Sequence, residues 1–184
     1  MLGKRVDRWP GGCFYPAVLM KLPTIISLTG ILMISNASAV VLVTDDFSYP
    51  DGNLVGNGSW VTFSGTGSPV QVTSGAVSLT HGGGSREDVS LGFAPQASGT
   101  VGFSFDFSIA DVGAFAGTDN EYFAHFRDGA NQFAARLDVV PPTVGGDYTL
   151  GIASVGSVAD AIYPTDFSYG TTYNVKVTYN LDTD

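Results

Sequence analysis

The chain has 184 residues, 44% of them hydrophobic and 12% aromatic, with 17 acidic residues against 8 basic ones. This length suits one domain or slightly more, and the apolar share is too high for a disordered chain. The formal charge of -9 disfavours a protein that tracks nucleic-acid phosphates or adheres to an anionic membrane, because both need clustered Lys and Arg. A single cysteine excludes a disulfide framework within the chain.

An uncharged apolar run occupies residues 22–34, directly after Lys21. It is followed by Ala37-Ser38-Ala39, whose small residues fit the positions that a signal peptidase recognises. The pattern predicts that residues 1–39 are a secretory signal peptide, cleaved after Ala39. We therefore expect a protein that is secreted or held at the cell surface.

Two alternatives concern this leader. Translation that starts at Met20 would give a compact signal with a short cationic start, whereas a start at Met1 would give a longer one. The apolar stretch from Leu22 to Val43 is also long enough to be an uncleaved membrane anchor. Its Ser, Thr and Asn content and the small residues near Ala39 favour cleavage.

Removal of residues 1–39 would leave a cysteine-free domain at residues 40–184, with four basic and sixteen acidic residues and a formal charge of -12. This part shows the two-residue hydrophobic alternation of strands, bounded by Gly, Pro, Asn and Asp. The clearest case is 100–109, where apolar residues alternate with Gly, Ser and Asp. The pattern predicts an all-β fold, an antiparallel β-sandwich of about ten strands. The expected strands are 40–44, 60–63, 70–73, 76–80, 89–93, 100–109, 122–127, 132–139, 147–152 and 173–179.

Turn residues divide these strands. Asp128-Gly129-Ala130-Asn131 and Ser74-Gly75 predict hairpins, and Gly145-Gly146-Asp147 opens the strand that follows. Pro141-Pro142 cannot donate ladder hydrogen bonds, so we expect them to end a strand at a sheet edge. The segment 157–170 lacks a strand pattern and predicts a loop or a short helical turn.

The segment 45–60, DDFSYPDGNLVGNGSW, resembles the start of concanavalin A-like (LamG-like) jelly-roll domains. Residues 170–184 are similar to the penultimate strand and turn of that class. Such domains occur in secreted bacterial proteins with a PEP-CTERM sorting tail, so the resemblance implies a jelly roll. The family pattern would continue after Asp184 with a closing strand. We therefore expect that the sequence is a fragment and that an unpaired edge strand favours self-association.

Residue patterns for catalysis are weak. A jelly-roll glycoside hydrolase would carry alternating carboxylates on one strand, whereas Glu87 and Asp88 are adjacent and would point to opposite faces. His81 and His125 are the histidines of the chain, and no Gly-x-Ser-x-Gly elbow accompanies them. We therefore predict a protein that is not an enzyme.

Candidate ligand-binding residues are aromatic platforms that could stack on a sugar, together with one cation in a glycine-rich loop. They are Trp60, Tyr122, Tyr148, Tyr163 and Arg86. Packing in the core is the alternative for each aromatic residue. Calcium is the possible cofactor, because the acids near the two ends of the domain supply the hard oxygen ligands that this ion prefers. The candidate metal ligands are Asp45, Asp46 and Asp182, and turn formation is the alternative for them.

Together these features predict a secreted, non-catalytic β-sandwich module that binds carbohydrate or mediates extracellular contact. Its partner would be a polysaccharide or extracellular matrix. Two alternatives remain open: a divergent jelly-roll glycan hydrolase or lyase, and a purely structural surface protein.

Overall fold

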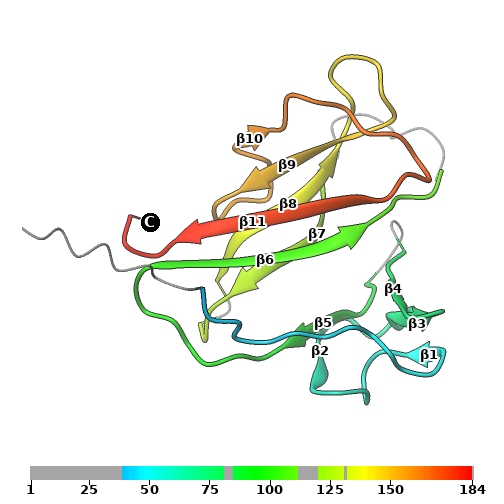
Figure 1. The fold of residues 1–184 in the computed structure, drawn as a ribbon, viewed down its shortest axis with the longest axis vertical. Coiled ribbons are helices and arrows are strands. Elements are labelled where there is room, and N and C mark those ends of the chain that lie inside the picture. Colours follow the sequence, from blue (N-terminus) through cyan, green and yellow to red (C-terminus); the bar gives the residue numbers. More distant parts are fainter. Residues whose placement is uncertain (1–38, 81–84, 112–119, 131, 184) are drawn as a thin grey trace, which may run out of the picture. The chain divides into compact units, whose positions relative to one another are not determined.

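A computed structural model describes residues 39–80, 85–111, 120–130 and 132–183 (Figure 1). The fold below is that of the unit Val40–Asp184. The expected signal peptide, the Met20 start and His81 lie outside the described residues.

The prediction of an all-β fold is confirmed: the described residues form eleven strands and no helix, and every strand pair is antiparallel. The strands are β1 (Gly52–Asn53), β2 (Trp60–Ser64), β3 (Gln71–Thr73), β4 (Ala76–Ser78), β5 (Asp88–Leu91), β6 (Thr100–Phe107), β7 (Glu121–Arg127), β8 (Phe133–Val140), β9 (Thr149–Ala153), β10 (Ala161–Ile162) and β11 (Tyr173–Asn180).

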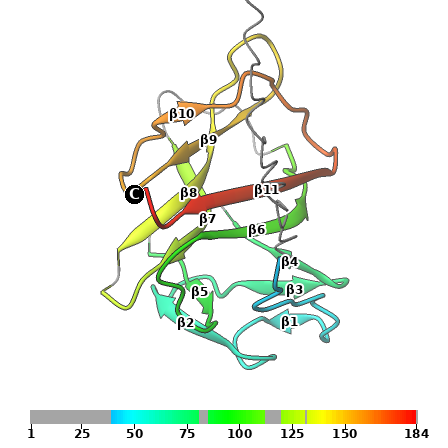
Figure 2. The ribbon, with the colours of Figure 1, turned by 60° about the vertical axis from the view of Figure 1, so that its left-hand side comes forward.

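The larger part of the fold consists of two facing sheets (Figures 1 and 2). One has the strand order β10-β9-β8-β7, and the other is the pair β11-β6. Along β6 the residues alternate between exposed and half-buried, as the sequence predicts. The half-buried Phe103 and Phe105 face β7, where their rings lie 5.1 Å from Phe126 and 6.0 Å from Phe123.

The core lies between these sheets. Leu137 of β8, Leu150 of β9 and Val177 of β11 are buried in one cluster with Tyr148, which is 0% exposed. β6 thus covers β7, and β11 lies against β8. The layers form a sandwich, whereas the jelly-roll connectivity stays an expectation from the resemblance.

The remaining strands form two smaller sheets, β1-β3-β4 and β2-β5 (Figure 2). They have a separate small core of Leu54, Val70 and Val72, against which the half-buried Trp60 packs.

Both predicted hairpins form. Ser74 and Gly75 join β3 to β4 with positive φ values of 52° and 76°, the conformation that tight hairpin turns require. Asp128 begins the connection between β7 and β8, and its carboxylate accepts a hydrogen bond from Ala130 N. β8 ends at Val140, before the two prolines, as predicted. The expectation of an edge strand is wrong, because β8 lies between β7 and β9.

Three strand predictions differ from the structure. Residues 40–44 form no strand, and their side chains are exposed. Two-residue strands occur at β1 and at β10, the latter inside the segment 157–170 that was expected to be a loop or helical turn. Such short strands carry too few residues for a periodic pattern to indicate them.

Candidate functional site

Polar and aromatic side chains gather on the face of β7 and β8 that points away from the main core. Because side chains alternate along a strand, Arg136 and Asp138 of β8 point away from the core that Leu137 helps to form. We call this group the outer-face cluster. Its members are Tyr122, His125, Phe133, Arg136 and Asp138.

Irregular backbone brings these residues to one face. The pairing of β7 with β8 shifts register on both sides of Ala124, and such bulges redirect side chains. On β8, Ala135 adopts a left-handed φ of 51°, which is strained for a residue with a Cβ. Strained backbone of this kind concentrates at functional sites. Here it lets Phe133 join Arg136 on the outer face.

The Arg136 guanidinium lies over the rings of Tyr122 and Phe133. Its Cζ is 4.2 Å from the ring centre of Tyr122 and 5.5 Å from that of Phe133. One amino group, Nη1, donates a hydrogen bond of 2.7 Å to the carbonyl oxygen of Gly156. The side chain is 7% exposed, and its Nε–H has no partner.

Asp138 is the least expected member of the cluster. It is 0% exposed, and neither carboxylate oxygen accepts a hydrogen bond. Burial raises the pKa of this carboxyl, while the nearby Arg136 charge acts in the opposite direction. Buried polar groups in folded proteins are nearly always paired. The two unpaired oxygens of Asp138 are therefore an exception among buried polar groups.

A loop forms one wall beside Asp138. Gly151 lies opposite Asp138 on β9, and a Cβ built on it would lie only 2.6 Å from the Cβ of Ala159. The missing side chain thus lets the loop 154–160 approach the sheet. The loop is fastened by Asp160, whose carboxylate accepts hydrogen bonds from the backbone N and the hydroxyl of Ser154.

His125 extends the cluster along β7. Its ring centre lies 4.3 Å from that of Phe133, and Nδ1 lies 2.9 Å from the Phe126 carbonyl oxygen. Burial lowers the pKa of His125, so the imidazole is neutral at pH 7. A neutral imidazole can both donate and accept a hydrogen bond.

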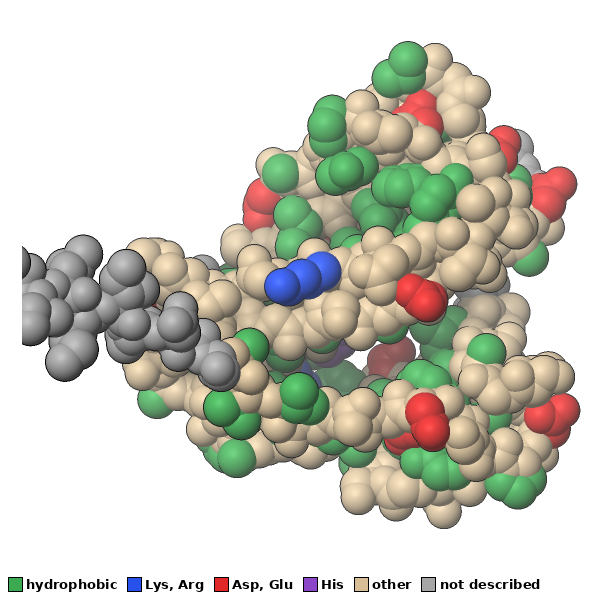
Figure 3. All heavy atoms as spheres, in the orientation of Figure 1, with side chains coloured by type: hydrophobic (Ala, Val, Ile, Leu, Met, Phe, Trp, Pro, Cys, Tyr) green, Lys and Arg blue, Asp and Glu red, His purple; other side chains and the backbone are tan. Residues whose placement is uncertain are grey.

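The outer-face cluster borders a hollow. Figure 3 shows a recess between the two facing sheets and the smaller sheets, with histidine and acidic side chains visible inside it. From the smaller sheets, the Phe63 ring contacts Phe133 at 6.1 Å between centres, and the Arg127 guanidinium lies 3.8 Å from the centre of the same Phe63 ring. Asp88 of β5 acts electrostatically on Tyr122 and His125. The recess therefore combines aromatic rings with charges of both signs.

The structure places one of the five predicted ligand-binding residues, Tyr122, in this cluster. Tyr148 is fully buried in the main core, so its ring is not available as a stacking platform. Tyr163 is 55% exposed and stacks on Phe167 at 5.7 Å. Arg86 is half-buried and pairs through its backbone with Gly67.

Trp60 and the predicted metal ligand Asp45 are brought together in a structural role. The Asp45 carboxylate accepts hydrogen bonds from Trp60 Nε1 at 2.8 Å, Tyr49 Oη at 2.7 Å and Phe47 N at 2.8 Å. Burial raises the pKa of Asp45, but these hydrogen bonds outweigh that effect and lower it overall. The carboxylate thus fastens the loop before β1 to the start of β2.

The other predicted metal ligands also accept hydrogen bonds from backbone N–H groups. Asp46 accepts a hydrogen bond from Ser48 N within its own turn, whereas the two oxygens of Asp182 share the single N–H of Gly99, which lies 83 residues away in the chain. Within the described ranges, no three His, Cys, Asp or Glu side chains are grouped so that they could hold a metal ion.

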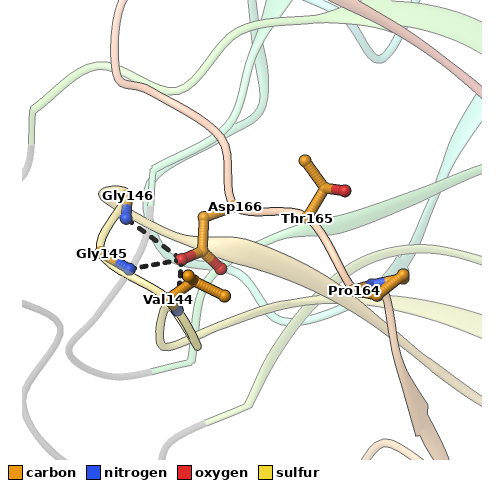
Figure 4. Close-up of a pocket in the computed structure, with 6 residues that line it drawn as sticks. All are labelled: Val144, Gly145, Gly146, Pro164, Thr165 and Asp166. Carbon is orange, nitrogen blue, oxygen red and sulfur yellow. Dashed lines mark hydrogen bonds between the residues drawn. The ribbon is translucent and has the colours of Figure 1, made fainter.

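A second hollow lies beside Asp166 (Figure 4). One carboxylate oxygen of Asp166 accepts backbone hydrogen bonds from Val144, Gly145 and Gly146 at 2.6–3.1 Å, and the other accepts one from Thr143 N at 2.8 Å. Successive N–H groups of this kind form an anion-binding nest, which the protein's own carboxylate already fills. The hydrogen bonds of Asp166 thus stabilise the loop before β9. Among the described residues that line this hollow, no side chain is buried without a partner as Asp138 is.

Comparison of the chain with protein-family models, with curated proteins and with solved structures finds no match. The described residues also include no helix that is long and apolar enough to cross a membrane. The outer-face cluster is therefore interpreted from its own chemistry.

Proposed function

We propose that this protein is a secreted, non-catalytic β-sandwich module that binds carbohydrate at the outer-face cluster. The observation that carries the proposal is the pair of unsatisfied groups on β8. The Asp138 carboxylate and the Arg136 Nε–H are both buried, lack partners and lie on the same face two residues apart. The sequence features of residues 1–39 support secretion.

A sugar hydroxyl suits these two groups because it donates and accepts hydrogen bonds at once. Both groups are enclosed in this structure, so the loop 154–160 beside Asp138 has to open first. The hydroxyl can then donate to the carboxylate of Asp138 and accept from Nε–H of Arg136, and so satisfy both. The rings of Tyr122 and Phe133 surround these groups with apolar surface, and Arg136 already lies over one face of Tyr122. The neutral His125 provides a further polar group.

The charge of the domain limits the class of glycan that can bind. The domain is strongly acidic, and Asp88 and Asp138 contribute negative charge around the outer-face cluster, where Arg136 contributes positive charge. A polyanionic glycan would be repelled by this field. We therefore expect neutral polysaccharides, such as β-glucan or xylan, to bind more tightly than alginate.

The test is a binding titration of the full chain with neutral and acidic oligosaccharides by calorimetry. Asp138→Asn removes the carboxylate without changing its shape, and we expect it to weaken binding about ten-fold or more, because each 1.4 kcal/mol changes affinity ten-fold. Asp106→Asn is the matched control, since Asp106 is an exposed strand residue on β6. A chain that binds no glycan, or one whose binding Asp138→Asn leaves unchanged, would refute the assignment.

The same samples test the enzyme alternative. Incubation with β-glucan, xylan and alginate, followed by assays for new reducing ends and unsaturated products, would reveal a hydrolase or lyase. Product formation that is lost in Asp138→Asn would replace the binding-module proposal with a catalytic one.

A further inference from the structure

Exposed apolar side chains concentrate in two places on this domain. Of the eleven large hydrophobic residues that are exposed within the described ranges, eight fall in residues 40–43 and 155–163. The first group is a run of Val and Leu before β1, and the second surrounds β10. Exposed apolar residues that share one face can mark an interaction site, and in the second group the residues on the core face of the sheet are the ones that matter below.

The second group, around β10, is exposed because the two facing sheets differ in their number of strands. β6 covers β7 and β11 covers β8, but the four-stranded sheet continues to β9 and β10, beyond the free edge of β11. Figure 3 shows hydrophobic side chains uncovered beyond β11, over β9 and β10. Within the described residues, β11 pairs along one edge alone, with β6. The fold thus has room for one more strand beside β11.

The residues below this position are apolar. Ala161 is exposed and lies opposite Ile152, so both point to the core face of the sheet. Tyr163 is 55% exposed, although its ring stacks on the core residue Phe167. A strand added beside β11 would lie about 10 Å above these residues, which is the usual spacing of packed sheets. It would bury them.

Residues 40–43 have the properties of that strand. Val40, Val41, Leu42 and Val43 are 79%, 74%, 42% and 43% exposed, and they form no strand in this structure. Val is among the residues most enriched in β-strands, and a run of four apolar residues is costly to leave in water. In Figures 1 and 2, the start of the described chain (blue) lies on the β6 side of the β6-β11 pair. The β6-β11 pair therefore separates it from the free edge of β11 in its own copy.

We propose that residues 40–43 of one copy of this chain add as a strand to the free edge of β11 in a second copy and cover Ala161 and Tyr163. The exchange is reciprocal, so a two-fold symmetric dimer satisfies both copies. Backbone hydrogen bonds to β11 provide affinity, and the apolar side chains provide specificity, as in other cases of strand addition. This assembly is independent of the outer-face cluster.

Sedimentation velocity of the full chain over a range of concentrations tests the proposal. We expect a monomer–dimer equilibrium, whose dissociation constant rises about ten-fold or more in Val41→Asp and in Ala161→Asp. Both positions are exposed, so neither variant disturbs the fold, which circular dichroism verifies. Val61→Asp, at a 55% exposed position of β2, is the matched control and should leave the equilibrium unchanged.

Cross-linking tests the contact itself. In a Cys13→Ser background, chains with Val41→Cys and chains with Ala161→Cys should be joined into a dimer by a bismaleimide reagent, whose reach of about 10 Å matches the spacing of packed sheets, when they are mixed. A chain that stays monomeric at about 0.1 mM, or a dimer that Val41→Asp does not weaken, would overturn the proposal. A dimer that Val61→Asp weakens as much as Val41→Asp does would overturn it as well.

Discussion

The replacement Asp138→Asn should make the free protein more stable. Asp138 is fully buried without a hydrogen-bond partner, and an unsatisfied buried group costs about 1–3 kcal/mol, more when it is charged. Asn keeps the shape and removes the charge but retains a buried amide. We therefore expect a gain of about 1–2 kcal/mol at pH 7, which raises the melting temperature by about 2–8 °C for a domain of this size.

The pH dependence of this gain follows from the pKa. Burial raises the pKa of Asp138 above its ordinary value of 3.8, which it has in the unfolded chain. The folded protein then binds the proton more readily than the unfolded chain, so the cost of the charge is present at neutral pH. It disappears as the pH falls through the folded-state pKa. The difference between Asp138→Asn and the native protein should shrink accordingly from pH 7 to pH 4.

Urea titrations at pH 7 and pH 4, without ligand, measure both quantities. Asp106→Asn is again the control, because Asp106 is exposed and bonded by Asn174, and it should cost no more than about 0.5 kcal/mol. A loss of stability in Asp138→Asn at pH 7 would refute the reasoning. It would mean that the carboxylate already has a stabilising partner in the free protein.

Three further predictions concern other groups. Tyr148→Phe should raise the free energy of unfolding by about 1 kcal/mol in thermal denaturation, because the Tyr148 hydroxyl is buried without a partner. The same burial raises the pKa of Tyr148 to about 12. Lower stability of the variant would show that the hydroxyl is bonded. Asp45→Ala removes three hydrogen bonds and should cost about 1–3 kcal/mol, seen as a red shift of Trp60 emission, whereas an unchanged spectrum would contradict this role. Asp166 has a lowered pKa, chiefly from the backbone hydrogen bond of Thr143, so its contribution is present above the unfolded value of 3.8 and is lost as the pH falls through the folded one. In Asp166→Asn, amide exchange at residues 143–146 should be fast at pH 7, and native-like protection there would exclude the proposed nest.

The sequence predicts the strands well where one face is buried and the other is in water. β6 shows this best, because its alternation of apolar and polar residues identifies a strand before any neighbouring strand is known. The same reasoning fails for residues 40–44, where the strand-forming residues are present but no neighbouring edge lies along them in the single chain. Propensity supplies a candidate strand, and pairing decides whether it forms.

The outer-face cluster is hidden from sequence reasoning for a related reason. Arg136 and Asp138 look like solvent-facing residues of a half-buried strand, and only tertiary structure shows that both are buried. Their burial depends on the loop 154–160 and on the aromatic rings around them. One signal was available: β8 carries opposite charges two residues apart within an apolar strand. Such a pair on one strand face is a sign of a specific polar site.

The location of the unsatisfied groups supports binding over a purely structural role. Four buried side-chain polar atoms lack partners in the described residues, and three of them belong to Arg136 and Asp138. These residues lie on β8, which is paired on both sides and so held rigidly. Groups fixed in this way lose little entropy when a ligand binds. Ala135, which lies next to Arg136 in β8, has a strained left-handed backbone and adds a second local cost in free energy. Both costs fall on the same part of β8. A bound hydroxyl would remove the one that comes from the unsatisfied groups.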